Sequence, residues 1–247
     1  MLHWKQEAQG KSALMIDGAR RIGKSYIVEE FAKNEYKSYI LVDFNNADEN
    51  LMEIFDKYLK NLDMFFSYLG LYFNVTLYPR DTVIIFDEVQ LYPQARAAIK
   101  YLVKDGRYDY IETGSLVSIN RNVKDIVIPS EEQRINMFPM DFEEYLWAMG
   151  DEQMMPFIRN CFEKKQPLGP LHRKAMDYFR HYMIVGGMPQ AVAEYVETND
   201  FMKVDRIKRN ILSLYKADIE KYAVGNETKV KAIFDEIPSA LSKHEKK

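Results

Sequence analysis

The stretch GARRIGKS, residues 18–25, decides how this chain folds. Gly18 and Gly23 enclose a short variable segment, and Lys24 and Ser25 follow the second glycine. We expect both glycines to adopt backbone conformations that other residues avoid, so that consecutive N–H groups turn inward and form a nest for an anion. A following helix would direct its positive end at the same point. The spacing therefore predicts a phosphate-binding loop, formed by Gly18, Ala19, Arg20, Arg21, Ile22, Gly23, Lys24, Ser25 and Tyr26.

The sequence on either side supplies the strand and helix that such a loop requires. ALMI (residues 13–16) is apolar on both faces, as a buried parallel strand must be, and residues 24–33 alternate at helical spacing. We expect the Lys24 ammonium to reach the β- and γ-phosphates of a nucleotide and the Ser25 hydroxyl to coordinate Mg²⁺. In this context G-x-x-x-x-G-K-[ST] is the P-loop pattern, and it predicts binding of ATP with Mg²⁺.

A second element, VIIFDEVQ (residues 83–90), reads as a buried strand that ends in two carboxylates. Asp87 at the end of that strand is the candidate for holding the Mg²⁺ and its water shell. Glu88 points elsewhere and could polarise an attacking water. The chain between the loop and Asp87 leaves room for another strand and helix, as in P-loop ATPases with an additional central strand. The two elements together predict hydrolysis of ATP.

Two hydroxyl side chains close the next expected strand, in TGS (residues 113–115). A hydroxyl there can hydrogen-bond the γ-phosphate or the attacking water, with Ser115 as the first candidate and Thr113 as the second. A glycine-containing turn that caps the strand explains the same residues equally well.

Arginines are the remaining candidates, because phosphoryl transfer often needs a cation from outside the loop. Arg121 and Arg134 lie between the fourth and fifth expected strands, and either could project from one subunit into a neighbour's site. An ordinary surface position is the alternative for both. Arg20 and Arg21 occupy variable loop positions, and we expect their side chains at the rim of the site.

The chain alternates strands and helices in its first part and is helical afterwards. This pattern predicts an α/β fold with a parallel sheet and helices on both faces, to about residue 150, followed by a helical region. Asp141 caps a short helix and Gly186-Gly187 end a later one. The expected strands are 13–16, 38–44, 82–88, 108–115 and 134–140, and the expected helices are 24–33, 49–71, 94–104, 141–149, 154–165, 171–185, one from 189, and 200–222.

The composition excludes several classes of protein. The 247 residues are 47% hydrophobic and carry a net charge of -3, which does not indicate a nucleic-acid-binding chain as a whole. Cys161 is the only cysteine, and the 4 histidines are scattered, so neither a disulfide framework nor a thiolate metal site is expected. No apolar run approaches the ~20 residues of a membrane span, and the N-terminus lacks the apolar core of a signal peptide. We therefore expect a cytoplasmic protein without a membrane partner.

Six segments, in order, resemble the bacterial and archaeal AAA-superfamily ATPases that carry a C-terminal domain of unknown function. They are GARRIGKS, VIIFDEVQ, YIETGS, INMFPMDFEEYL, VGGMP and ILSLYKADIEKY. The resemblance implies an AAA-like ATP-binding domain over residues 1–150 with sheet order 5-1-4-3-2. It also implies that residues 151–247 are the helical beginning of a longer second half, with winged-helix-like and nuclease-like parts, most of which we expect to be missing. ATP, Mg²⁺ and cytoplasmic location carry over through Gly18, Gly23, Lys24, Ser25, Asp87 and Glu88.

Three functions follow from these features. The first is an ATP-hydrolysing switch or motor that acts on an unknown protein partner and whose homo-oligomer supplies an arginine finger. The second is a nucleotide-dependent interaction module with negligible hydrolysis. The third is a P-loop kinase for a small molecule, against which the adjacent Glu88 favours water as the acceptor. Nucleic acid is a possible partner only through the missing C-terminal part, since a solvated helix face explains the basic stretch 203–210 equally well.

Overall fold

The computed structural model describes residues 1–115, 131–223 and 225–242, without the side chains of residues 220–222. The chain forms two units, Met1–Pro139 and Met140–Lys247. The sequence placed the division near residue 150. The structure places it earlier because the helix that follows Met140 packs its buried Tyr145 among apolar residues of later helices, including Val185 and Val192.

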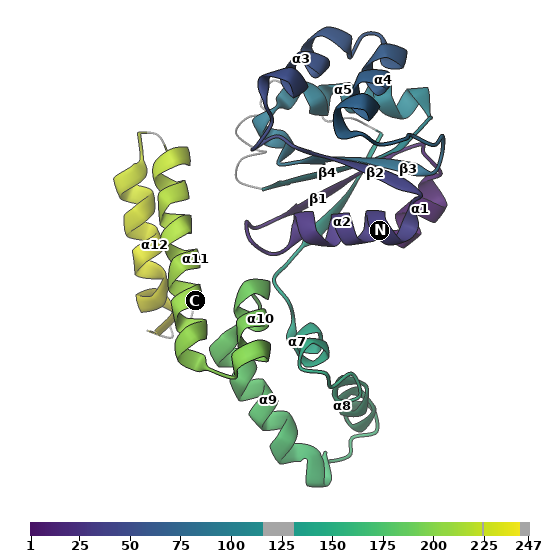
Figure 1. Cartoon of the computed structure of the whole chain (residues 1–247). Coiled ribbons are helices and arrows are strands. Elements are labelled where there is room, and N and C mark those ends of the chain that lie inside the picture. The colour runs from purple at the N-terminus through teal and green to yellow at the C-terminus, as the bar shows by residue number, and fades with distance from the viewer. Residues whose placement is uncertain (116–130, 224, 243–247) are drawn as a thin grey trace. The chain divides into compact units, whose positions relative to one another are not determined.

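A five-stranded sheet forms the centre of the first unit, with helices on both faces (Figure 1). The strand order is β2-β3-β4-β1-β5, and every neighbouring pair is parallel. Read from the other edge this is the predicted order 5-1-4-3-2, so the predicted P-loop α/β fold class is confirmed. The strands are β1 (Ala13–Gly18), β2 (Ser38–Asp43), β3 (Thr82–Asp87), β4 (Asp109–Ser115) and β5 (Glu132–Met137).

Helices α1 and α2 cover one face of the sheet, and α3, α4 and α5 cover the other (Figure 1). The single helix expected over residues 49–71 is wrong, because the chain forms α3 and α4 there. Asn61 starts α4, since its side-chain oxygen accepts a hydrogen bond from the Met64 N–H at 3.4 Å. The helices of this unit are α1 (Leu2–Ala8), α2 (Lys24–Glu35), α3 (Glu49–Tyr58), α4 (Leu62–Phe73), the 3₁₀ turn η1 (Val89–Leu91) and α5 (Pro93–Asp105).

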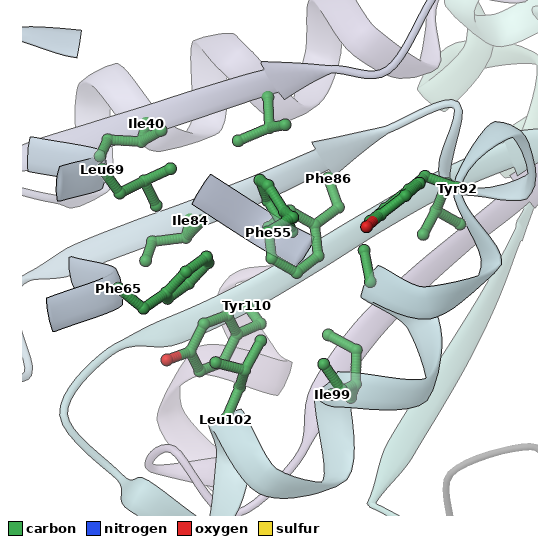
Figure 2. Close-up of a cluster of buried hydrophobic side chains, with 14 of the residues drawn as sticks. Ile40, Phe55, Phe65, Leu69, Ile84, Phe86, Tyr92, Ile99, Leu102 and Tyr110 are labelled. Carbon is green, nitrogen blue, oxygen red and sulfur yellow. The ribbon is translucent and has the colours of Figure 1, made fainter. Parts of the chain in front are cut away.

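The larger core lies between the sheet and α3, α4 and α5 (Figure 2). Phe55 of α3 is its centre: its ring makes edge-on contacts with Phe65 of α4 at 5.1 Å and with Phe86 of β3 at 5.7 Å between centroids. Ile99 and Leu102 of α5 pack against the same face of the sheet (Figure 2). This aromatic packing fixes the strands whose carboxyl ends carry the candidate site.

A buried arginine ties three strands to α5 on this face. The Arg96 side chain is 0% exposed, and its Nη2 lies 2.8 Å from the Glu132 carboxylate of β5. Its Nη1 lies 3.9 Å from Glu112 of β4 and 3.5 Å from the sulfur of Met15 of β1. Burial raises the pKa of Glu112 well above its usual range, against the opposing charge of Arg96.

The second unit consists of helices with two small cores around Tyr145 and Leu146. The sequence predicted how several of these helices begin and end. Asp141 and Glu144 form a capping box at the first helix, and Gly186 is the C-terminal cap of α9, with φ 79°. The elements are α7 (Phe142–Ala148), α8 (Met154–Glu163), the 3₁₀ turn η2 (Gly169–Leu171), α9 (His172–Val185), α10 (Pro189–Thr198), α11 (Phe201–Tyr222) and α12 (Glu227–Ser242). In the described part of the chain, no helix has the length and apolar character needed to cross a membrane.

Substituting Arg96 tests whether the buried ion pair holds the sheet together. We expect Arg96→Met to lower the free energy of unfolding of the first unit by about 3–5 kcal/mol, because it removes the buried cation beside Glu132 and leaves that carboxylate with the partly exposed Arg134. The measurement is urea unfolding followed by fluorescence of Trp4, which is 3% exposed, in a Trp147→Phe background. Lys57→Ala is the control, since Lys57 and Glu53 form an exposed ion pair on α3, and it should change little. An unchanged urea midpoint for Arg96→Met would contradict the expectation.

Candidate functional site

The candidate site lies where β1, β3 and β4 end, which is the edge of a parallel sheet at which ligands bind in open α/β folds. The predicted loop connects β1 to α2, and α2 begins at Lys24 with Gly23 as its N-terminal cap. The Ile27 N–H already donates to the Gly23 carbonyl at 3.0 Å. The free N–H groups of the first turn therefore point back toward the loop.

The two glycines of the loop have different roles. Gly23 has φ 91°, as predicted, but Gly18 does not have a positive φ, so the predicted reason for that glycine is wrong. Gly18 is needed for space: a Cβ there would lie 2.4 Å from the Met137 carbonyl oxygen and 2.5 Å from Cδ1 of Ile22. The second left-handed position belongs to Arg21, with φ 66°. The loop therefore turns at Arg21 and Gly23 and is packed closely at Gly18.

One side chain of the loop is buried beneath it, and others lie at the rim of the site. Ile22 is 1% exposed and packs beneath the loop, so only its backbone is available to a ligand. Arg21 and Tyr26 are exposed and Arg20 is half-buried, consistent with the predicted rim position of the two arginines. The loop can thus hold an anion with backbone N–H groups while its side chains fix its shape.

Lys24 lies across the loop that it follows. Its ammonium donates to the carbonyl oxygens of Ala19 at 2.7 Å and of Gly18 at 3.3 Å, and its side chain is nearly buried. Burial lowers the pKa of Lys24, and the carboxylates of Glu88 and Asp87 oppose this shift. An anion held in the loop would favour the charged form of this lysine, so the residue is placed to respond to phosphate.

Asp87 joins the loop helix to two strands. Its Oδ1 accepts a hydrogen bond from the Ser25 hydroxyl at 2.8 Å and another from the Thr113 hydroxyl of β4. Thr113, which is fully buried, also accepts from the backbone N–H of Glu88 at 3.2 Å. The structure thus brings together Ser25, Asp87, Glu88 and Thr113 from three separate sequence motifs.

The donor set around Asp87 suits Mg²⁺. Ser25 and Asp87 present a hydroxyl and a carboxylate oxygen 2.8 Å apart, and Mg²⁺ takes hard oxygen ligands, with one or two carboxylates completed by phosphates and water. Within the described ranges, no group of three or more His, Cys, Asp or Glu side chains forms an all-protein metal site. The Ser25 hydroxyl and the Asp87 carboxylate could hold Mg²⁺ together with phosphate and water oxygens.

Glu88 sits on a strained backbone and is held by a residue that the sequence analysis missed. Its φ is 53°, in the left-handed region that side chains with a Cβ rarely adopt. The Gln90 side-chain amide donates to the Glu88 carboxylate, and Gln90 is itself 3% exposed. The only signal in the sequence is a polar residue two positions after the acidic pair. Gln90 and Thr113 together orient this glutamate.

Three predicted site residues remain to be placed: Ser115, Arg134 and Arg121. Ser115 is buried at the end of β4, paired with Gly18 across the ladder, while Thr113 is the hydroxyl that contacts Asp87. Arg134 lies on β5 and forms ion pairs with Asp17 and Glu132 of its own chain. Arg121 lies outside the described residues. The assignment of a sensor hydroxyl and of an arginine finger stays a prediction.

A family model described as an AAA domain matches residues 10–146. The chain belongs to the AAA domain family. A second model, described as a domain of unknown function, matches residues 176–246, from within α9 through α12. The predicted resemblance to AAA-superfamily ATPases followed by a domain of unknown function is therefore confirmed. The winged-helix-like and nuclease-like parts that the resemblance also implied stay a prediction.

Solved structures that resemble the chain share little sequence with it. The ORC1 protein of Aeropyrum pernix in complex with DNA has 8% identity and a TM-score of 0.38, over 74% of this chain and 64% of that one. AMPPCP-bound DnaA from Aquifex aeolicus has 11% identity and a TM-score of 0.42, over 90% and 68%. The replication initiator DnaA bound to AMPPCP and single-stranded DNA has 12% identity and a TM-score of 0.47, over 89% and 67%. A search of curated proteins finds no match.

Replacing Thr113 tests the hydrogen-bond chain of this AAA domain. We expect Thr113→Val to lower the free energy of unfolding of the first unit by about 1–3 kcal/mol, because the Glu88 N–H loses its acceptor and Asp87 Oδ1 loses one of its two hydroxyl donors. Thr113→Ser, which keeps the hydroxyl, should lose less. The measurement is urea unfolding followed by Trp4 fluorescence. Equal losses for the two variants would show that the methyl group of Thr113, rather than its hydroxyl, matters.

Proposed function

We propose that this protein binds ATP with Mg²⁺ at its AAA domain, hydrolyses it, and uses the cycle as a switch or motor in the cytoplasm. The observation that carries the proposal is the hydrogen-bond chain from Ser25 through Asp87 and Thr113 to Glu88, directly beside the loop that holds Lys24. Together these residues offer a phosphate-binding cation, a pair of oxygen ligands for Mg²⁺ and a carboxylate that can act as the base.

Binding would use the backbone and the two residues that follow it. The N–H groups between Gly18 and Ser25 would enclose the phosphates, and the Lys24 ammonium would leave the loop carbonyls for the β- and γ-phosphate oxygens. Ser25 and Asp87 would hold Mg²⁺, which would offset the negative charge of those oxygens. The exposed Arg21 and Tyr26 at the rim can contact the rest of the nucleotide.

Hydrolysis would depend on Glu88 as the base that polarises water. Its carboxylate is oriented by Gln90, and its backbone is oriented by Thr113. Thr113 or Ser115 would contact the γ-phosphate or the attacking water. An arginine finger from a second copy of the chain, Arg121 or Arg134, would complete the site in a homo-oligomer.

The switch role rests on how the two units are connected. β5 pairs with the loop strand β1 along its length, and the second unit begins three residues after β5 ends. A change at the loop is therefore carried by a strand that leads directly into the helical unit. We propose that this unit, including the domain of unknown function, is the part that acts on a protein partner.

Two alternatives remain, and phosphate release separates them. A nucleotide-dependent interaction module would bind ATP but release no phosphate, even at high protein concentration. A small-molecule kinase would release phosphate only slowly without an added acceptor, whereas the Glu88 carboxylate beside the site favours water.

Substituting the loop lysine tests binding. We expect Lys24→Ala to abolish ATP binding measured by calorimetric titration, because the loop loses the ammonium that lies against the Gly18 and Ala19 carbonyls. Lys33→Ala is the matched control: Lys33 lies on the same helix, exposed and paired with Glu29 and Glu30, and its loss should leave affinity unchanged. Tight ATP binding by Lys24→Ala would exclude the loop as the nucleotide site.

Substituting the proposed base tests hydrolysis. We expect Glu88→Gln to keep ATP binding and to slow steady-state phosphate release by about 10²–10⁴-fold, as loss of a general base does. Glu30→Gln, on the exposed face of α2, is the control. Release should be followed over a range of protein concentrations, since a finger from a second copy predicts turnover that rises with assembly. Wild-type turnover by Glu88→Gln would remove Glu88 from the mechanism.

A further inference from the structure

A buried carboxylate lies directly before the phosphate loop. Asp17 is the residue that precedes Gly18 in β1, and it is 2% exposed. One of its oxygens, Oδ1, has no hydrogen-bond partner among the described residues. The other, Oδ2, lies 3.6 Å from Nη1 of Arg134. A carboxylate placed this way costs free energy unless a cation accompanies it.

Asp17 also acts on the loop through its charge. Burial lowers the pKa of Lys24, and the negative charge of Asp17 is among those that oppose this shift, so Asp17 acts on the cation of the phosphate site. A triphosphate bound in the same loop would feel this charge as repulsion, which is poorly screened in a buried position. An uncompensated Asp17 would therefore oppose the ligand that the loop is built to hold.

Arg134 is the group placed to compensate Asp17. Asp17 pairs with Asn136 in the ladder between β1 and β5, and Arg134, two residues earlier, lies on the same side of the sheet as Asn136. Its Nε donates to Glu132 at 2.7 Å while its Nη1 faces Asp17, so one guanidinium serves two carboxylates. Such bridging is a property of the planar, always charged arginine side chain.

Other charges around Asp17 do not replace Arg134. Burial raises the pKa of the Asp17 carboxyl; Arg134 opposes this most, followed by Arg96, while Glu132 adds to it and Lys24 opposes it. The guanidinium of Arg96 is directed to Glu112 and Glu132, and Lys24 is directed to the loop carbonyls, whereas Nη1 of Arg134 lies 3.6 Å from Asp17. Arg134 is thus the main cation for Asp17.

We propose that Arg134 is a positioning residue for the phosphate loop of its own chain: by neutralising Asp17, it allows the loop to accept the triphosphate. The inference rests on the proposed ATP binding and assigns Arg134 a role other than that of a finger in a neighbour's site. It makes β5, the strand that leads to the second unit, a determinant of nucleotide affinity.

The test is a double-mutant cycle in the full chain, read as ATP affinity by calorimetric titration. Arg134→Met should weaken binding about tenfold, because Asp17 is left facing the phosphates alone. Asp17→Asn should bind at least as tightly as the wild type, and Asp17→Asn with Arg134→Met should bind as Asp17→Asn does. Arg134→Lys should recover most of the affinity. Arg107→Met is the matched control, since Arg107 also pairs with two carboxylates but lies just before β4 begins.

A pH series gives a readout that a merely structural role would not move. In Arg134→Met, the pKa of Asp17 would rise further, and the carboxyl would be neutral below that pKa and charged above it. The affinity lost in this variant, relative to wild type at the same pH, should therefore grow as pH is raised across the range in which both proteins stay folded. In the double variant this pH dependence should disappear.

Each of the other results overturns the proposal. If Arg134→Met binds ATP with wild-type affinity, Arg134 does not neutralise the charge of Asp17 for the benefit of the ligand. Binding by the double variant as weak as that of Arg134→Met means that Arg134 acts without Asp17. Normal affinity with lost turnover in Arg134→Met, recovered on mixing with Lys24→Ala chains, identifies a finger instead.

If Arg134→Met does not fold, the double variant and Arg134→Lys decide: both must bind ATP, and failure of either refutes the pair. Absence of ATP binding by the wild-type protein would instead refute the proposed function on which the inference rests.

Discussion

The hydrogen bonds received by Asp87 are the interaction on which the rest of the site depends. A buried carboxylate at the end of a parallel strand must find donors, and here they come from the loop helix through Ser25 and from the neighbouring strand through Thr113. Because Thr113 also accepts from the Glu88 N–H, one carboxylate sets the position of α2, β4 and the proposed base. The aromatic core around Phe55 and Phe86 supports this edge from one face of the sheet.

The charged side chains near the loop have different partners on the two faces of the sheet. On the face covered by α2, Asp87 faces hydroxyl donors, whereas on the face covered by α5, Asp17, Glu132 and Glu112 face the guanidinium groups of Arg134 and Arg96. Buried ion pairs contribute little net stability compared with apolar packing, so their retention here favours a role in holding β5 in register. β5 is an exposed edge strand with few apolar contacts of its own, and these ion pairs supply what packing does not.

Local patterns in the sequence predicted most of the fold, and failed where distant residues decide. Apolar runs and P-loop spacing identified the strands and the loop, because each signal lies within a few neighbouring residues. The break between α3 and α4 was missed because the apolar stripe continues across it, while a single cap at Asn61 ends the pattern. Arg96 gave no signal and Gln90 only a weak one, since their importance comes from partners that only the folded chain places beside them. Gly18 was expected to have an unusual backbone conformation, whereas the structure requires a glycine there for space.

The left-handed backbone conformation of Glu88 lowers the stability of the fold at this position. A left-handed residue with a Cβ costs about 1–2 kcal/mol relative to ordinary backbone, and glycine would avoid that cost. The turn between β3 and η1 is therefore not the most stable one that this chain could form. Selection for stability alone would therefore favour glycine at this position and would remove the carboxylate that we propose as the base.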